Sequence, residues 1–154
     1  MIGPIVSEYP DTEESADFFS VAAKHSASSV REILAYKENL PPEALEALST
    51  DQSVSVLRNL VSTAGFKKFA TQELLENLIS RDVEIAQIVA SSLAAYEEAD
   101  TNKLAALLVA HSDPSVAASL ADGWAMPKKI LKNLLKHPDP WIVFKAKQSL
   151  EDQT

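Results

Sequence analysis

Apolar residues recur along the chain at spacings of three, four and seven positions, which is the period of an α-helix. Between residues 128 and 135, for example, Ile130, Leu131 and Leu134 form one stripe, and lysines and Asn133 fill most of the other positions. No stretch alternates apolar and polar residues over the length of a strand. The pattern therefore predicts an all-α fold without a β-sheet.

A short turn sequence separates the apolar runs and recurs through the chain. Its clearest copies are His137-Pro138-Asp139-Pro140 and His111-Ser112-Asp113-Pro114, and a weaker copy with serines in place of the aspartate begins at His25. The aspartate suits a helix N-cap and the proline suits the first helical position, where no amide N–H is needed. The histidine suits the C-terminal end of the preceding helix dipole. We therefore predict that a helix is capped by each of four aspartates, namely Asp51, Asp82, Asp113 and Asp139.

An aliphatic residue follows each copy of the turn, and these residues are 24, 31, 31 and 26 positions apart. A repeat of about 20 to 50 residues, with one supersecondary unit per repeat, is typical of a solenoid. The spacing predicts about five short antiparallel helix pairs stacked as an α-solenoid. The aligned aliphatic residues are Val30, Val54, Ile85, Val116 and Ile142.

The breaks between apolar runs predict the domain organisation. Residues 15–150 are expected to form a single helical-repeat domain, preceded by an N-terminal tail or strap over residues 1–14. Pro4 and Pro10 predict irregular structure in that segment, and Gly65 is expected as a left-handed residue just past a helix end. The expected units are residues 15–39, 40–65, 66–99, 100–125 and 126–150, with a tail at 151–154.

Composition narrows the classes of protein. The chain has 154 residues, of which 46% are hydrophobic, and no cysteine, which excludes disulfides, thiolate metal sites and a cysteine nucleophile. We read no signal peptide at the start and no apolar run of transmembrane length. We therefore expect a cytoplasmic protein without a membrane partner.

The net charge of −8 is distributed unevenly. Residues 1–123 carry 8 Lys and Arg against 19 Asp and Glu, whereas residues 124–150 carry 6 lysines against Asp139 alone. A nucleic-acid groove needs positive potential along its length, so we do not expect nucleic acid as a partner. The basic segment suits an acidic protein surface.

The run from Leu40 to Asp51, together with the turns at residues 111–116 and 137–143, resembles bacterial HEAT-like repeats, and more narrowly the leucine-rich repeat variant. The resemblance covers roughly residues 15–150. Arg31 directly follows the aliphatic Val30, as in many HEAT units. The family implies a right-handed α-solenoid whose exposed faces bind macromolecules. One variant protein of this type carries a cysteine-ligated iron–sulfur cluster, which a chain without cysteine cannot hold.

The residues that could carry catalysis have simpler interpretations. His25, His111 and His137 occupy the same point of different repeats, so a metal site is not expected and we interpret them as cations at helix ends. The carboxylate clusters at Glu13-Glu14, Glu97-Glu98-Asp100 and Glu151-Asp152 lie at helix ends and connectors, where solvated charge is ordinary. We therefore predict no catalytic residue, no cofactor and no enzymatic activity.

The last helix carries the most distinctive candidates for partner contact. Trp141 and Phe144 fall on the side opposite the apolar stripe, with Gln148 between them in angle and Lys145 beside them. The alternatives are that Trp141 folds back over its partner helix, or that both aromatics belong to a terminal cap. In the family the second helices line the concave side, which adds further candidates: Arg31, Glu32, Ser55, Arg58, Asn59, Gln87, Ser91 and Asp122.

Three functions fit this sequence. The first is a non-catalytic scaffold that binds a protein partner through the concave face, the C-terminal unit, or both, with a homodimer through the C-terminal unit as one form. The second is a HEAT-like nucleic-acid-binding or base-repair protein. The third is a HEAT-like lyase or chaperone for a bound cofactor.

Overall fold

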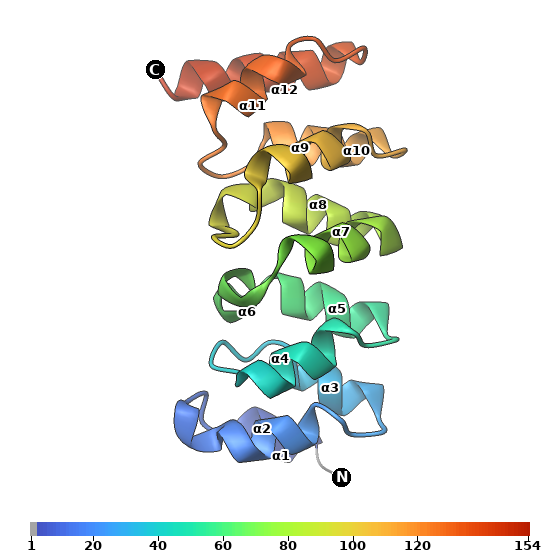
Figure 1. Ribbon diagram of the computed structural model, residues 1–154, viewed down its shortest axis with the longest axis vertical. Coiled ribbons are helices and arrows are strands. Elements are labelled where there is room, and N and C mark those ends of the chain that lie inside the picture. The colour runs from blue at the N-terminus through green and yellow to red at the C-terminus, as the bar shows by residue number, and fades with distance from the viewer. Residues whose placement is uncertain (1–2) are drawn as a thin grey trace. The chain divides into compact units, whose positions relative to one another are not determined.

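A computed structural model describes residues 3–154, with side chains from Ile5 onward (Figure 1). These residues form α-helices, two short 3-10 turns and loops, with no strand among them, which confirms the all-α prediction. They divide into two compact units, unit 1 ending at Phe69 and unit 2 comprising Ala70–Thr154. The part of the expected N-terminal tail at residues 1–2 lies outside the described residues.

In unit 1, alternate helices contact each other. Helix α2 packs on α4 and α3 packs on α5, while each consecutive pair, α2 with α3 and α4 with α5, is also in contact. The apolar stripes meet between them, so that large side chains such as Phe19, Leu34 and Leu57 are fully buried. The elements of unit 1 are α1 (Gly3–Glu8), η1 (Glu13–Ser15), α2 (Ala16–Ala22), α3 (Ser28–Leu34), α4 (Pro42–Ser49), α5 (Val54–Val61) and α6 (Ala64–Phe69).

Unit 2 repeats this layering over three helix pairs. Helices α7, α9 and α11 form one row, helices α8, α10 and α12 form a second row, and the two rows contact each other (Figure 1). Leu75, Ile85, Leu104 and Leu120 are fully buried within it. The elements of unit 2 are α7 (Gln72–Arg81), α8 (Val83–Ser91), η2 (Leu93–Ala95), α9 (Thr101–Val109), α10 (Pro114–Ala121), α11 (Lys128–Leu134) and α12 (Pro140–Asp152).

The sequence led us to expect irregular structure before residue 10, but residues 3–8 are helical. Residues from Gly3 to Glu8 form α1, which packs against α3 and buries the side chain of Val6 completely. Pro4 is compatible with this helix because it lies in the first turn, where the backbone N–H has no partner within the helix.

Gly65 also differs from its predicted role. It lies inside α6, and no described glycine has a positive φ. A Cβ at this position would lie 2.3 Å from the carbonyl oxygen of Glu38, closer than any real contact of this kind. The position therefore takes glycine because two backbone segments approach closely, and not because of a left-handed conformation.

The second helix pair is shifted by two residues from the predicted alignment. The N-cap of α5 is Ser53, so the fully buried Val56, and not Val54, corresponds to Ile85, Val116 and Ile142. Asp51, which we predicted as the cap of this helix, lies two residues before the N-cap. Asp51 therefore holds the position that a histidine holds in the turns at residues 25, 111 and 137.

Candidate interaction surface

Three of the four aspartates predicted as caps hold the first turn of a second helix. The carboxylate of Asp82 accepts a hydrogen bond from the amide of Ile85, that of Asp113 from Ser115, and that of Asp139 from Trp141. Hydrogen bonds from the side chain and backbone of Ser115 lower the pKa of the Asp113 carboxyl group, because they favour its charged form. These contacts fix where α8, α10 and α12 begin.

A second recurring feature lies two residues before four of the N-caps. The Nδ1 atoms of His25, His111 and His137 each accept a hydrogen bond, 3.0 Å long, from the amide of the N-cap residue. Asp51 takes the same place before α5, and its Oδ1 accepts from the amide of Ser53 at 2.8 Å. A backbone amide can only donate, so Nδ1 is the acceptor in these turns. The imidazoles therefore act here as hydrogen-bond acceptors, a role that the sequence analysis did not assign to them.

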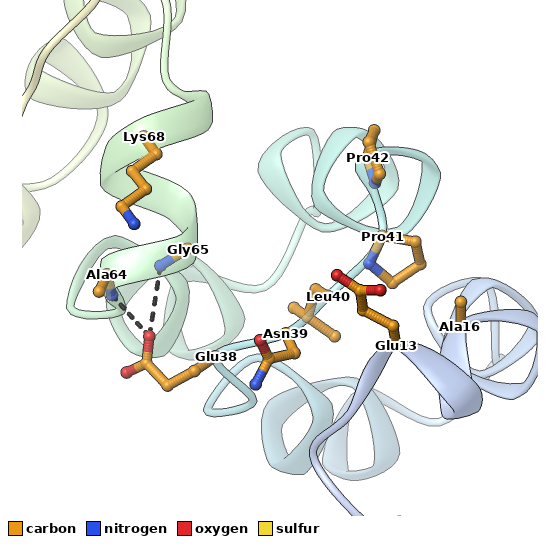
Figure 2. Close-up of a pocket in the computed structure, with 10 residues that line it drawn as sticks. All are labelled: Glu13, Ala16, Glu38, Asn39, Leu40, Pro41, Pro42, Ala64, Gly65 and Lys68. Atoms are coloured by element: carbon orange, nitrogen blue, oxygen red, sulfur yellow. Dashed lines mark hydrogen bonds between the residues drawn. The ribbon is translucent and has the colours of Figure 1, made fainter.

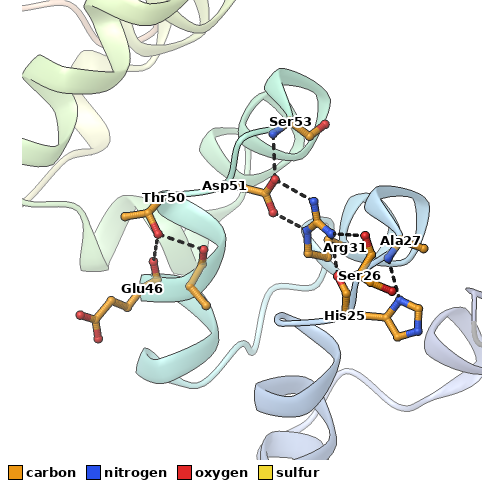
Figure 3. Close-up of polar contacts among 9 residues, drawn as sticks. His25, Ser26, Ala27, Arg31, Glu46, Thr50, Asp51 and Ser53 are labelled. Atoms are coloured by element: carbon orange, nitrogen blue, oxygen red, sulfur yellow. Dashed lines mark hydrogen bonds and ion pairs between the residues drawn. The ribbon is translucent and has the colours of Figure 1, made fainter.

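Asp51 also binds Arg31 from the preceding helix pair (Figure 3). Two hydrogen bonds join them: Nε of Arg31 donates to Oδ2 of Asp51 at 2.5 Å, and Nη2 donates to Oδ1 at 3.1 Å. The side chain of Arg31 is 16% exposed and that of Asp51 is 4% exposed. The guanidinium also donates to the carbonyl of His25 at 2.6 Å. The hydrogen bond to Asp51 raises the pKa of Arg31. Arg31 thus joins two consecutive turns, and we had predicted it as a partner contact.

Three other predicted contacts on second helices, Glu32, Asn59 and Gln87, also join neighbouring helix pairs. Asn59 donates to the carbonyl of Glu32 at 3.0 Å, and Gln87 donates to the hydroxyl of Ser115 at 2.7 Å. In each case the residue five positions after one N-cap contacts the second helix of the next pair. Arg58 holds the corresponding position on α5, and its carbonyl accepts from the hydroxyl of Ser62 at 3.1 Å.

Unit 2 extends this scheme to its last helix. Lys145 of α12 forms an ion pair with Asp122, which directly follows α10, and the hydroxyl of Ser149 donates to the carbonyl of Ala121 at 2.6 Å. Sequence reasoning proposed Asp122 as a surface contact and did not find Ser115 or Ser149.

Trp141 and Phe144 stand out against this background because they are large, apolar and exposed. They are 58% and 47% exposed, and their rings stack with centroids 5.5 Å apart. The Nζ atom of Lys145 lies 5.2 Å from the centroid of the Trp141 ring, within the range of a cation–π contact. Gln148 is exposed on the same helix. An aromatic pair with a cationic edge is thus presented on α12.

Unit 1 contains a hollow of about 500 Å³ between η1, the loop after α3 and the start of α6 (Figure 2). The carboxylate of Glu38 accepts hydrogen bonds from the amides of Ala64 and Gly65, at 2.7 and 3.3 Å. Glu38 therefore caps α6, and its charge is used within the fold. Across the hollow, Glu13 comes from η1 and Lys68 from α6.

Two properties of the described residues limit the kind of site that they can form. Within residues 3–154, no group of three or more histidine and acidic side chains is arranged to hold a metal ion. In the same part of the chain, no helix has both the length and the apolar character needed to cross a bilayer.

Comparison with known proteins identifies one segment. Curated proteins and solved structures gave no match. The family model described as "Leucine rich repeat variant" matches residues 29–53, which run from the first turn of α3 through α4 to the N-cap of α5. The chain therefore carries a helical repeat of the leucine rich repeat variant type, which confirms the resemblance predicted from its sequence.

Proposed function

We propose that this chain is a non-catalytic helical-repeat scaffold that binds a protein partner through α12. The observation that carries the proposal is the stacked pair of Trp141 and Phe144, both about half exposed on a helix of 13 residues. Aromatic side chains such as Trp and Phe are among the residue types enriched at the centres of protein interfaces.

The state of the other candidates supports the same surface. Neighbouring helix pairs already accept hydrogen bonds from the side chains of Arg31, Asn59 and Gln87. A partner could bind these donor groups only if those hydrogen bonds were broken. The aromatic rings of α12 have no such competing hydrogen bonds. We therefore place the partner surface on the C-terminal helix pair and not along the second helices.

Site-specific photo-crosslinking tests this proposal. A photoreactive phenylalanine analogue replaces Phe144, and the matched control carries it at Tyr36, which is 65% exposed but lies in unit 1. We expect protein adducts from position 144 after irradiation of cells and none from position 36. The absence of protein adducts at position 144 would reject the proposal, and a gel shift at low salt would then ask whether nucleic acid binds instead.

A further inference from the structure

Helices α9 and α11 form the walls of a second hollow, which lies within unit 2 and has a volume of about 440 Å³. Its floor is apolar, because Ala105 and Ile130 are buried there, at 6% and 3% exposure. Ala106, Val109 and Ala110 extend this surface along α9. The hollow is therefore a groove between the first helices of two neighbouring pairs, in the row that does not include α12 (Figure 1).

The groove lies where α9 carries smaller residues than the helices on either side of it. Six positions after the N-cap, α7 carries Asn77 and α11 carries Asn133, whereas α9 carries Ala106. One position earlier, α7 carries Glu76 and α9 carries Ala105. An alanine side chain ends at Cβ, so these two positions leave space above the backbone of α9.

An asparagine lies on each wall of the groove, Asn102 on α9 and Asn133 on α11, and both are exposed. Within the described part of the chain, neither side-chain amide forms a hydrogen bond. A carboxamide offers both a donor and an acceptor, as the main chain of a peptide does. An extended segment in the groove could therefore form main-chain hydrogen bonds to both walls. A helix could not, because its own hydrogen bonds already use these groups.

The charge around the groove is opposite in sign to that of the whole chain. The net charge of the chain is −8, but α9 contains one lysine, α11 contains three, and neither contains an acidic residue. In contrast, α4 and α7 each carry two glutamates. Lys129 lines the groove, and none of these four lysines forms an ion pair with another described residue. Asp100, the acid that adjoins α9, accepts hydrogen bonds from the amides of Asn102 and Lys103. Charge complementarity therefore favours an acidic occupant.

We infer that the groove between α9 and α11 binds an extended, acidic segment of a partner protein, with an aliphatic side chain of that segment on the apolar floor. Lys129 pairs with an acidic side chain of the segment, and Asn102 and Asn133 bind its main chain. This site goes beyond the proposed function, because it is separate from the aromatic pair on α12. The groove is open and small, so binding should be weak, with a dissociation constant of about 10 µM to 1 mM.

Fluorescence anisotropy with a labelled peptide tests the inference. The probe has two central leucines with three glutamates on each side, and a control peptide has serines in place of the leucines. We expect saturable binding that weakens as salt is added, and that is about tenfold or more weaker for the serine peptide, which cannot use the apolar floor. Equal binding of the two peptides would overturn the inference, and so would tighter binding of a single-stranded oligonucleotide of the same charge.

Two variants with matched controls locate the bound peptide. Ala106→Trp fills the groove and Lys129→Glu reverses a charge at its edge, so each should weaken binding about tenfold or more. Leu107→Trp enlarges a residue of α9 that does not line the groove, and Lys68→Glu makes the same charge change in unit 1. Both controls should leave the dissociation constant unchanged, and circular dichroism melting curves establish that all four variants fold. No saturable binding at peptide concentrations up to about 1 mM, or equal losses in variants and controls, would overturn the inference.

Phe144→Ser separates this site from the proposed surface on α12. The variant should bind the acidic peptide as tightly as the parent protein, because Phe144 does not line the groove. A loss of peptide binding in this variant would place the peptide on α12 and overturn the inference. Photo-crosslinking at position 144 does not depend on the groove, so the two proposals can fail independently.

Discussion

At the scale of single residues, the acceptor two positions before four of the N-caps is the main feature that the sequence analysis missed. The residue types were read correctly as turn residues, but the histidines were interpreted only as helix-end cations and not as acceptors. The copy with Asp51 shows what they share, because a carboxylate and an imidazole Nδ1 can both accept from the same amide. A residue's chemistry in isolation did not reveal this, since histidine suits both a cationic and an acceptor role.

The acceptor role predicts a rescue by aspartate. His137→Ala should lower the free energy of unfolding by about 0.5–1.5 kcal/mol, because the amide of Asp139 loses its hydrogen bond. His137→Asp should recover most of this loss at neutral pH, as Asp51 does naturally. Urea denaturation of the two variants measures the difference, and equal losses in both would contradict the acceptor role.

The cap at Asp113 predicts a dependence on acid. The hydrogen bonds from Ser115 lower the folded-state pKa of Asp113 below that of the unfolded chain. Its contribution is therefore complete above the unfolded value of about 3.9 and is lost as pH falls through the lower, folded value. Asp113→Ala should destabilise the protein at neutral pH, and this deficit should shrink in acid. Asp113→Asn keeps an acceptor that does not titrate. Thermal melts of the parent protein and of both variants over this pH range therefore separate the contribution of the charge from that of the hydrogen bond.

At the scale of elements, the sequence predicted the helices of the repeats and the all-α class, because burial of one stripe per helix leaves a periodic pattern. It did not predict α1 or α6, whose six residues each are too short to show that period. Nor did it predict long-range contacts. Asp11, in the expected N-terminal tail or strap, accepts hydrogen bonds from the amides of Glu38 and Asn39. Such contacts depend on which turns become neighbours, and local patterns do not encode this.

The pair of Arg31 and Asp51 predicts coupling between consecutive helix pairs. Asp51→Ala should cost about 2–3 kcal/mol of stability, because it removes the acceptor for Ser53 and leaves a largely buried guanidinium without its carboxylate. A double-mutant cycle with Arg31→Met and Asp51→Asn should give a coupling energy of about 1 kcal/mol or more. Strict additivity of the two substitutions would show that the two turns are energetically independent.

At the scale of the whole molecule, the prediction that residues 15–150 form a single domain can be tested through the cooperativity of unfolding. Leu134→Ala opens a cavity at a fully packed position and should cost about 2–5 kcal/mol, whereas Leu107→Ala, at a side chain that is 43% exposed, should cost far less. In a repeat protein each helix pair is stabilised mainly by the helix pairs next to it. Amide hydrogen exchange in Leu134→Ala should therefore accelerate most in α11 and α12 and less in α7. Equal acceleration in every helix would contradict nearest-neighbour stacking.

The contact between Gly65 and the backbone of Glu38 has a consequence for mutational scans. Any side chain at position 65 must displace main-chain atoms, so almost every substitution there should be rejected by folding alone. A library selected for partner binding would show position 65 as intolerant and could suggest that it belongs to the recognition surface. Scoring the same library for cellular abundance would separate the two, because a steric requirement depletes variants before any partner is met.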